Sequence, residues 1–156
     1  MRPRQDSNLR IRLRRPTLYP LSYEGGAAIV RTMDAVPTVL VVDDDPVIQK
    51  LLQVNFEMEG YDVVIAGDGE EGLSLAREER PDLVLLDVMM PKMNGLDVAA
   101  AMRADELTQG IPIIMLSAKA QASDVQAGLD LGVNDYVTKP FDPLELLDRV
   151  GALLAR

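Results

Sequence analysis

The chain contains neither cysteine nor histidine, and each absence excludes a class of chemistry. Without cysteine, no disulfide framework and no thiolate metal site is possible, and a reducing compartment is permitted. Without histidine, the polypeptide has no histidine general base, no histidine metal ligand and no phosphohistidine intermediate of its own. The chemistry of this chain must therefore come from other side chains.

Long apolar runs are also absent. No stretch approaches the roughly 18 residues that span a bilayer, and the N-terminus lacks the apolar core of a secretory signal. At 156 residues and 47% hydrophobic composition, the chain suits one compact domain with its own core. We therefore expect a soluble, cytoplasmic protein with no membrane partner.

Charge is distributed unevenly along the chain. Residues 1–36 contain seven arginines against three acidic residues, a net charge of +4, whereas residues 37–156 carry a net charge of −13. A body this acidic lacks the positive face that binds phosphate backbones, so we expect no direct nucleic-acid contact. Proline and glycine interrupt the Arg-rich segment, which favours a disordered N-terminal extension. Met33 is a candidate true start of translation, in which case residues 1–32 are not translated.

From Thr38 onward, short apolar runs alternate with amphipathic segments of helical period. Runs of this length are typical of strands buried on both faces. The expected strands cover 39–42, 61–66, 83–86, 111–116 and 133–138. The expected helices begin after Asp45, Asp68, Asn94 and Asp142, which are capping residues, and a further helix covers roughly 122–131. Five βα units in strict alternation predict an α/β fold with a parallel sheet between two helical layers.

Polar side chains follow four of these apolar runs directly. They are Asp43-Asp44-Asp45, Asp87, Ser117 and Lys139. The carboxyl ends of parallel strands meet at one edge of the sheet, where ligands bind in open α/β folds. Carboxylates, a hydroxyl and an ammonium at this edge predict a site for a divalent cation and a phosphoryl group.

The acidic residues at this edge call for a counter-ion. Neighbouring carboxylates such as Asp43 and Asp44 repel each other unless a cation neutralises them, and Mg²⁺ suits a site of few carboxylates, phosphate oxygens and water. Asp87 can attack a phosphoryl donor to form an acyl phosphate. Mg²⁺ and Lys139 would screen the charge on the transferred oxygens, while Ser117 would donate a hydrogen bond to one of them.

Two further patterns suggest other functions. Residues 67–72 satisfy the G-x-G-x-x-G dinucleotide fingerprint, but acidic side chains stand where a pyrophosphate would sit, so a tight turn before a capped helix is the better interpretation. Residues 43–47 fit the D-x-D-x-[TV] signature and so resemble haloacid-dehalogenase-type phosphatases, in which Asp43 would be the nucleophile. That family's downstream acidic pair for magnesium is missing, and the scheme leaves Asp87 without a role.

Four motifs in the body share the spacing of one known family. They are Val41-Val42-Asp43-Asp44, Leu86-Asp87-Val88-Met89-Met90-Pro91 with Asn94-Gly95, Leu116-Ser117-Ala118, and Tyr136 through Lys139-Pro140-Phe141. On these motifs, residues 37–156 resemble a response-regulator receiver domain of two-component signalling. The resemblance implies a flavodoxin-like, doubly wound sheet of five strands in the order 2-1-3-4-5, with five helices.

The resemblance also implies roles for individual residues. Asp87 would accept phosphate from a sensor histidine kinase or a histidine phosphotransfer protein, and the domain would itself catalyse the transfer and the later hydrolysis. Mg²⁺ would be bound by Asp44 and Asp87, partly through water by Asp43, and by the backbone carbonyl of Met89. The Lys139–Pro140 bond would be cis.

A switch is implied in the same way. If Ser117 moves toward the phosphoryl group, the ring of Tyr136 can turn inward, and the last elements present a different surface to a downstream protein target. Because the chain ends at Arg156, soon after its last helix, we expect a stand-alone phosphorelay component, a signalling phosphoacceptor rather than an enzyme. A structural interaction domain with an inert site remains an alternative, although the intact acidic pair and Lys139 argue against it.

Overall fold

The computed structural model describes residues 17–24, 27–33, 36–118 and 121–155. The chain divides into two compact units, Met1–Pro37 and Thr38–Arg156. In the first unit, β1 (Thr17–Glu24) pairs antiparallel with β2 (Ala27–Met33).

The paired strands β1 and β2 differ from the disordered extension that sequence analysis expects. A Gly-Gly pair between two runs that contain tyrosine, valine and isoleucine is itself a hairpin signal. Residues 1–16 and the side chains of both strands lie outside the described part of the chain. The extension over residues 1–36, the domain over 37–156 and the start at Met33 therefore stay predictions.

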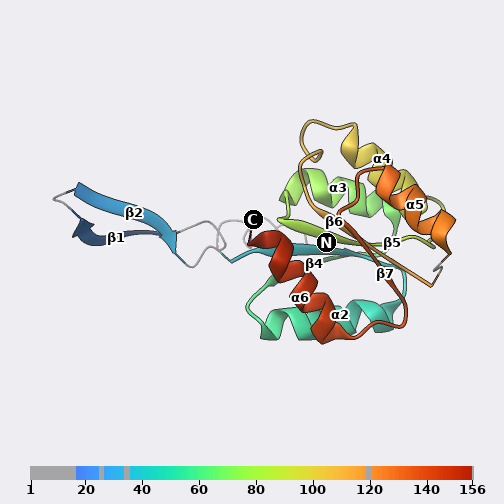
Figure 1. Cartoon of the computed structure of the whole chain (residues 1–156), viewed down its shortest axis with the longest axis horizontal. Helices are drawn as coiled ribbons and strands as arrows, with labels where there is room; N and C mark the ends of the chain where they lie inside the picture. The colour runs from blue at the N-terminus through green and yellow to red at the C-terminus, as the bar shows by residue number, and fades with distance from the viewer. Residues whose placement is uncertain (1–16, 25–26, 34–35, 119–120, 156) are drawn as a thin grey trace, which may run out of the picture. The chain divides into compact units, whose positions relative to one another are not determined.

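The second unit is a five-stranded parallel sheet between layers of helices (Figure 1). Its strands are β3 (Thr38–Val42), β4 (Asp62–Ala66), β5 (Leu83–Asp87), β6 (Ile113–Ser117) and β7 (Asp135–Thr138). Its helices are α2 (Pro46–Met58), α3 (Gly69–Glu79), α4 (Gly95–Arg103), α5 (Ala122–Asp130) and α6 (Pro143–Leu154). The strands lie in the order β4-β3-β5-β6-β7, which is 2-1-3-4-5 counted from β3. The predicted flavodoxin-like α/β fold is confirmed.

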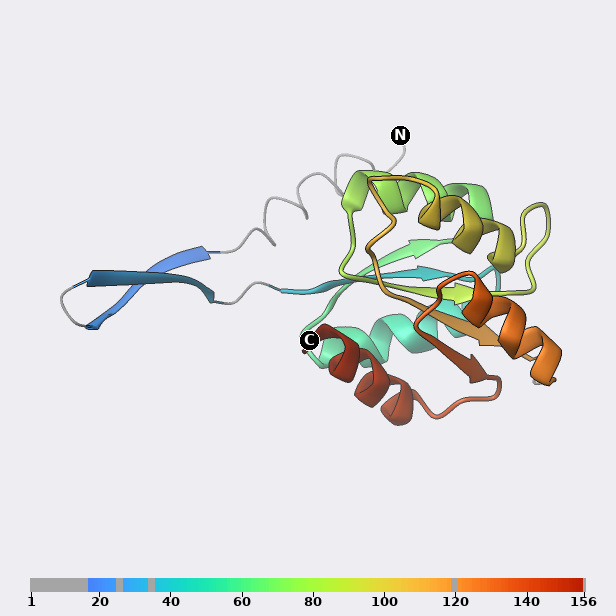
Figure 2. The same cartoon turned by 45° about the horizontal axis from the view of Figure 1, so that its top comes forward.

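The helices divide between the two faces of the sheet. In Figures 1 and 2, α2 and α6 cover one face, while α3, α4 and α5 lie on the other. Each face has its own buried apolar cluster, one including Phe56 and Val150 and the other including Val98 and Met102. Every residue of β3, β5 and β6 is buried, which is why these strands are almost entirely apolar until their last position.

Four of the five helices begin at a residue whose side chain accepts a backbone N–H. These capping residues are Asp45, Asp68, Asn94 and Asp142. The cap of α3 differs slightly from a capping box, because the carboxylate of Glu71 accepts the N–H of Gly67 at 2.8 Å, one residue before Asp68. The caps fix where these helices begin.

Arg80 ends α3 in a left-handed conformation, with φ 45° and ψ 62°. A residue with a Cβ is strained there, whereas glycine is not, so Arg80→Gly should raise the free energy of unfolding by roughly 1 kcal/mol. Urea denaturation measures the change. Lys50→Gly, on the exposed side of α2, is a control with the opposite sign, since glycine inside a helix costs about 1 kcal/mol. A less stable Arg80→Gly protein would contradict the assignment of strain.

Candidate functional site

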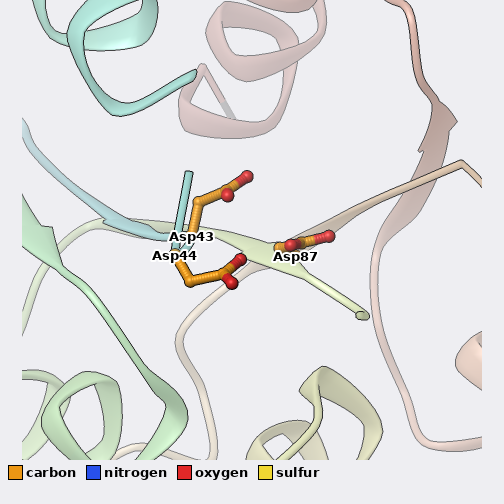
Figure 3. A group of neighbouring side chains, drawn as sticks. All are labelled: Asp43, Asp44 and Asp87. Atoms are coloured by element: carbon orange, nitrogen blue, oxygen red, sulfur yellow. The ribbon is translucent and has the colours of Figure 1, made fainter. Parts of the chain in front are cut away.

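Three aspartates meet at the carboxyl edge of the sheet (Figure 3). Asp43 and Asp44 follow β3, and Asp87 is the last residue of the neighbouring strand β5. One carboxylate oxygen from each residue lies within 4.8 Å of the other two. Asp43 is 0% exposed and Asp87 is 4% exposed, whereas Asp44 is exposed. Adjacent parallel strands thus bring Asp87 to Asp43 and Asp44, which precede it by 44 and 43 positions in the chain.

Lys139, which follows β7, reaches the same place. Its Nζ lies 3.0 Å from Oδ2 of Asp43 and 3.4 Å from Oδ1 of Asp87. The backbone N–H of Lys139 donates to the carbonyl of Ser117 at 2.8 Å, which fixes the lysine to the end of β6. The Lys139–Pro140 peptide bond is cis, as the resemblance implies.

The acidic residues perturb one another. Burial, followed by the negative charge of Asp43, raises the pKa of Asp87 to about 6, while Lys139 and the Met89 N–H act in the opposite direction. Burial acts to lower the pKa of Lys139, but its hydrogen bond to Asp43 and the charges of Asp43 and Asp87 outweigh it, and the net pKa is raised. Lys139 therefore stays a cation between the two carboxylates. Of these, Asp87 is protonated more readily than an ordinary aspartate because its pKa is raised.

The carboxylate of Asp43 is occupied at both oxygens. Its Oδ1 accepts the N–H of Asp45 at 2.9 Å, and its Oδ2 accepts a hydrogen bond from Lys139 at 3.0 Å. These hydrogen bonds connect Asp43 to the turn before α2 and to Lys139.

Gln49, in the first turn of α2, is a site residue that sequence analysis did not identify. Its side-chain amide donates to the backbone carbonyl of Asp43 and so fixes the turn between β3 and α2. A glutamine early in an exposed helix usually faces solvent, so the sequence alone gives only a weak signal for this contact.

The remaining predicted site residues lie along the same edge. Ser117 is buried at the end of β6, one residue beyond Leu116, which pairs with Asp87 in the sheet. The N–H of Met89 donates to Oδ1 of Asp87 at 3.3 Å, and Met89 is 54% exposed. Tyr136 is partly buried in β7 and packs against the apolar cluster under α3 and α4. Their roles in binding and switching stay predictions.

Comparison with models of known protein families identifies the family to which this site belongs. The model of the response regulator receiver domain matches residues 39–151. The chain belongs to the response regulator receiver family. The match covers the sheet edge with Asp43, Asp44, Asp87 and Lys139, and nothing in it supports the haloacid-dehalogenase alternative.

Individual relatives agree with this assignment. The DNA-binding response regulator MtrA of Mycolicibacterium smegmatis is 52% identical over 118 residues, which are 76% of this chain and 50% of MtrA. The structure of the chemotaxis protein CheY4 of Vibrio cholerae has a TM-score of 0.73 and 33% identity, covering 76% of this chain and 99% of that one. The receiver domain of the sensor histidine kinase PA1611 of Pseudomonas aeruginosa PAO1 has a TM-score of 0.72 and 32% identity, covering 78% and 100%; a magnesium ion is coordinated in its active site cleft.

The names of these relatives correct one expectation. The negative charge of residues 37–156 predicts no nucleic acid among the direct partners, yet MtrA is named a DNA-binding response regulator. This receiver spans about half the length of the curated relatives it matches. The net charge of residues 37–156 describes only the part of the relatives that this chain matches. It therefore does not predict whether a protein of the relatives' full length binds DNA.

Proposed function

We propose that this receiver is the phosphoacceptor of a two-component system or phosphorelay, and that Asp87 takes phosphate from a histidine of a sensor kinase or a histidine phosphotransfer protein. The observation that supports this most directly is the position of Asp87 at the end of a central strand, with its Oδ1 3.4 Å from Nζ of Lys139. The carboxylate attacks phosphorus, the bond from phosphorus to the histidine nitrogen breaks, and the imidazole leaves. An acyl phosphate on Asp87 is the product.

The neighbouring side chains have complementary tasks in this proposal. Lys139 is a cation within reach of Asp87, so it can bind an oxygen of the transferred group as negative charge develops there. Ser117, at the end of the adjacent strand, donates a hydrogen bond to another of these oxygens. The movement of Ser117 makes room for the ring of Tyr136, and this change marks the phosphorylated state.

The donor set fits Mg²⁺. Asp43, Asp44 and Asp87 offer oxygen atoms within 4.8 Å of one another, and Mg²⁺ prefers few carboxylates together with water. As the family resemblance implies, we assign direct contacts to Asp44, Asp87 and the Met89 carbonyl, and contacts partly through water to Asp43. When bound, the ion supplies positive charge next to the transferred phosphoryl oxygens.

The output of this proposal is a changed surface on β6, α5, β7 and α6, presented to a downstream protein target. Because MtrA is named DNA-binding, control of DNA binding is among the outputs that we propose. None of the helices in the described ranges is both long and apolar enough to cross a lipid bilayer. A cytoplasmic location belongs to the proposal, as does the role of a signalling phosphoacceptor whose only chemistry is transfer to Asp87 and hydrolysis from it.

Intact-mass spectrometry with acetyl phosphate and Mg²⁺ tests the proposal. Wild-type protein should gain one phosphoryl group, Asp87→Asn should gain none, and Asp130→Asn, an exposed change in α5, should behave as wild type. Catalytic turnover that persists in Asp87→Asn and depends on Asp43 would instead identify a phosphatase. Absence of an adduct with every donor, including the host's sensor kinases, would identify an inert interaction domain.

A further inference from the structure

The glycines of the 67–72 segment have no part in the proposed function, yet one of them makes a very close approach near the acidic site. A Cβ on Gly69 would lie 2.6 Å from the carbonyl oxygen of Met93. A Cβ on Gly95 would lie closer still to the carbonyl oxygen of Asp87, and 2.9 Å from Cα of Val88. Such separations are shorter than real Cβ contacts, so the backbone can pack this tightly only where glycine stands.

Gly95 joins the start of α4 to the backbone of Asp87 and Val88. Its N–H donates to the carbonyl of Val88 at 2.9 Å, and the N–H of Val88 in turn donates to the carbonyl of Leu116 in β6 at 3.0 Å. The atoms that a Cβ on Gly95 would meet belong to the backbone, not to a flexible side chain. They can move aside only if Asp87 moves as well.

Gly69 also contacts the loop of residues 88–94, at Met93. As the first residue of α3, it packs against the backbone of Met93 and the side chain of Val98. Residues 88–94 therefore lie between the first residues of two helices, each a glycine. The N–H of Met93 also donates within the loop, to the carbonyl of Pro91 at 2.8 Å.

We propose that Gly95 and Gly69 are positioning residues for phosphotransfer, which fix Asp87 and the 88–94 backbone relative to Asp43 and Asp44 before a metal binds. The inference rests on the proposed function. Groups that react must already be placed when the donor arrives, and a displacement of about 1 Å can cost on the order of 100-fold in rate. The inference also gives part of the glycine pattern a packing role in place of nucleotide binding.

Gly95→Ala and Gly69→Ala test this role, with Val150→Ala as the matched control. Val150 is 0% exposed in α6, in the apolar cluster on the other face of the sheet, so its truncation destabilises the fold without touching the 88–94 loop. Mg²⁺ affinity is measured by titration calorimetry, and the rate of adduct formation with acetyl phosphate at saturating Mg²⁺. Gly95→Ala should weaken Mg²⁺ binding by about 10-fold and slow the reaction by on the order of 100-fold. Gly69→Ala should show smaller losses of both, and Val150→Ala should keep both near wild type.

The outcomes separate the two proposals. If wild type forms no adduct with any donor, including the host's sensor kinases, the phosphoacceptor function fails; if wild type reacts and folded Gly95→Ala matches it in affinity and rate, the positioning role is overturned. Should Gly95→Ala not fold, Gly69→Ala decides by the same criteria. Hydrogen exchange of metal-free wild type adds a test that needs no variant: the Gly95 amide should be as protected as amides of β5, and exchange at the rate of an open loop would overturn the inference.

Discussion

Lys139→Met should destabilise the metal-free protein by roughly 2–4 kcal/mol and slow phosphorylation of Asp87 by about two to three orders of magnitude. The first effect arises because Lys139 is the cation placed between Asp43 and Asp87, both of which are buried. Without it two buried carboxylates face each other, and the cost is somewhat below that of a fully buried pair because 20% of the Lys139 side chain is exposed. The second effect follows from loss of a positive charge next to the transferred oxygens.

Two variants control for other causes. Lys139→Arg keeps the charge and should retain more stability than Lys139→Met, although its fork geometry does not match the ammonium. Lys50→Met removes an exposed lysine from α2 and should leave both quantities unchanged. Urea denaturation in EDTA gives the stability, and adduct formation at saturating Mg²⁺ gives the rate. If Lys139→Met behaves like Lys50→Met, the ion pairs with Asp43 and Asp87 contribute neither stability nor catalysis.

The strands were predictable because each is a continuous apolar run buried on both faces, and the errors lie where local hydrogen bonds replace the sheet. The last strand, expected from residue 133, begins at Asp135. Asn134, just before it, donates its N–H to the carbonyl of Ile113 at 2.7 Å and accepts the N–H of Ile113 on its side chain at 2.9 Å. These residues form a turn against the start of β6, which an apolar pattern does not reveal.

The acidic site was predictable to the extent that it follows from chain direction. Every parallel strand places its last residue at the same edge, so Asp43, Asp87 and Lys139 converge whatever the details of their loops. The contacts of Gln49 and Gly95 depend instead on how separate segments approach one another. A glycine in a sequence signals a turn or a close approach, but the atom that it approaches is set by tertiary packing.

In buffer without divalent cations, Asp87→Asn should be more stable than wild type at pH 8 by about 1–2 kcal/mol. The pKa of Asp87 is raised from 3.8 to about 6 in the folded protein. Between about pH 4 and 6 the folded state therefore binds more protons than the unfolded state, and wild-type stability falls as the pH rises through this window. Asparagine cannot ionise, so the stability of the variant does not fall in this way as the pH rises. The full shift, in which the opposing effect of Lys139 is already included, corresponds to at most about 3 kcal/mol, and solvent screening reduces it.

Denaturation of both proteins from pH 4 to 8 in EDTA measures this difference, with Asp130→Asn in α5 as the control. The difference in the free energy of unfolding between Asp87→Asn and wild type, the stability gap, should be largest at pH 8 and should shrink toward pH 4. Added Mg²⁺ should narrow or reverse it, because a ligand that binds the folded state stabilises wild type more than a variant lacking one donor. A gap that is absent at pH 8, or that does not depend on pH, would show that Asp87 ionises without penalty. Asp87→Asn should thus stabilise the metal-free protein and abolish its phosphorylation. The repulsion between the carboxylates of Asp43 and Asp87 destabilises the metal-free fold, and the same negative charge attracts a cation to the site.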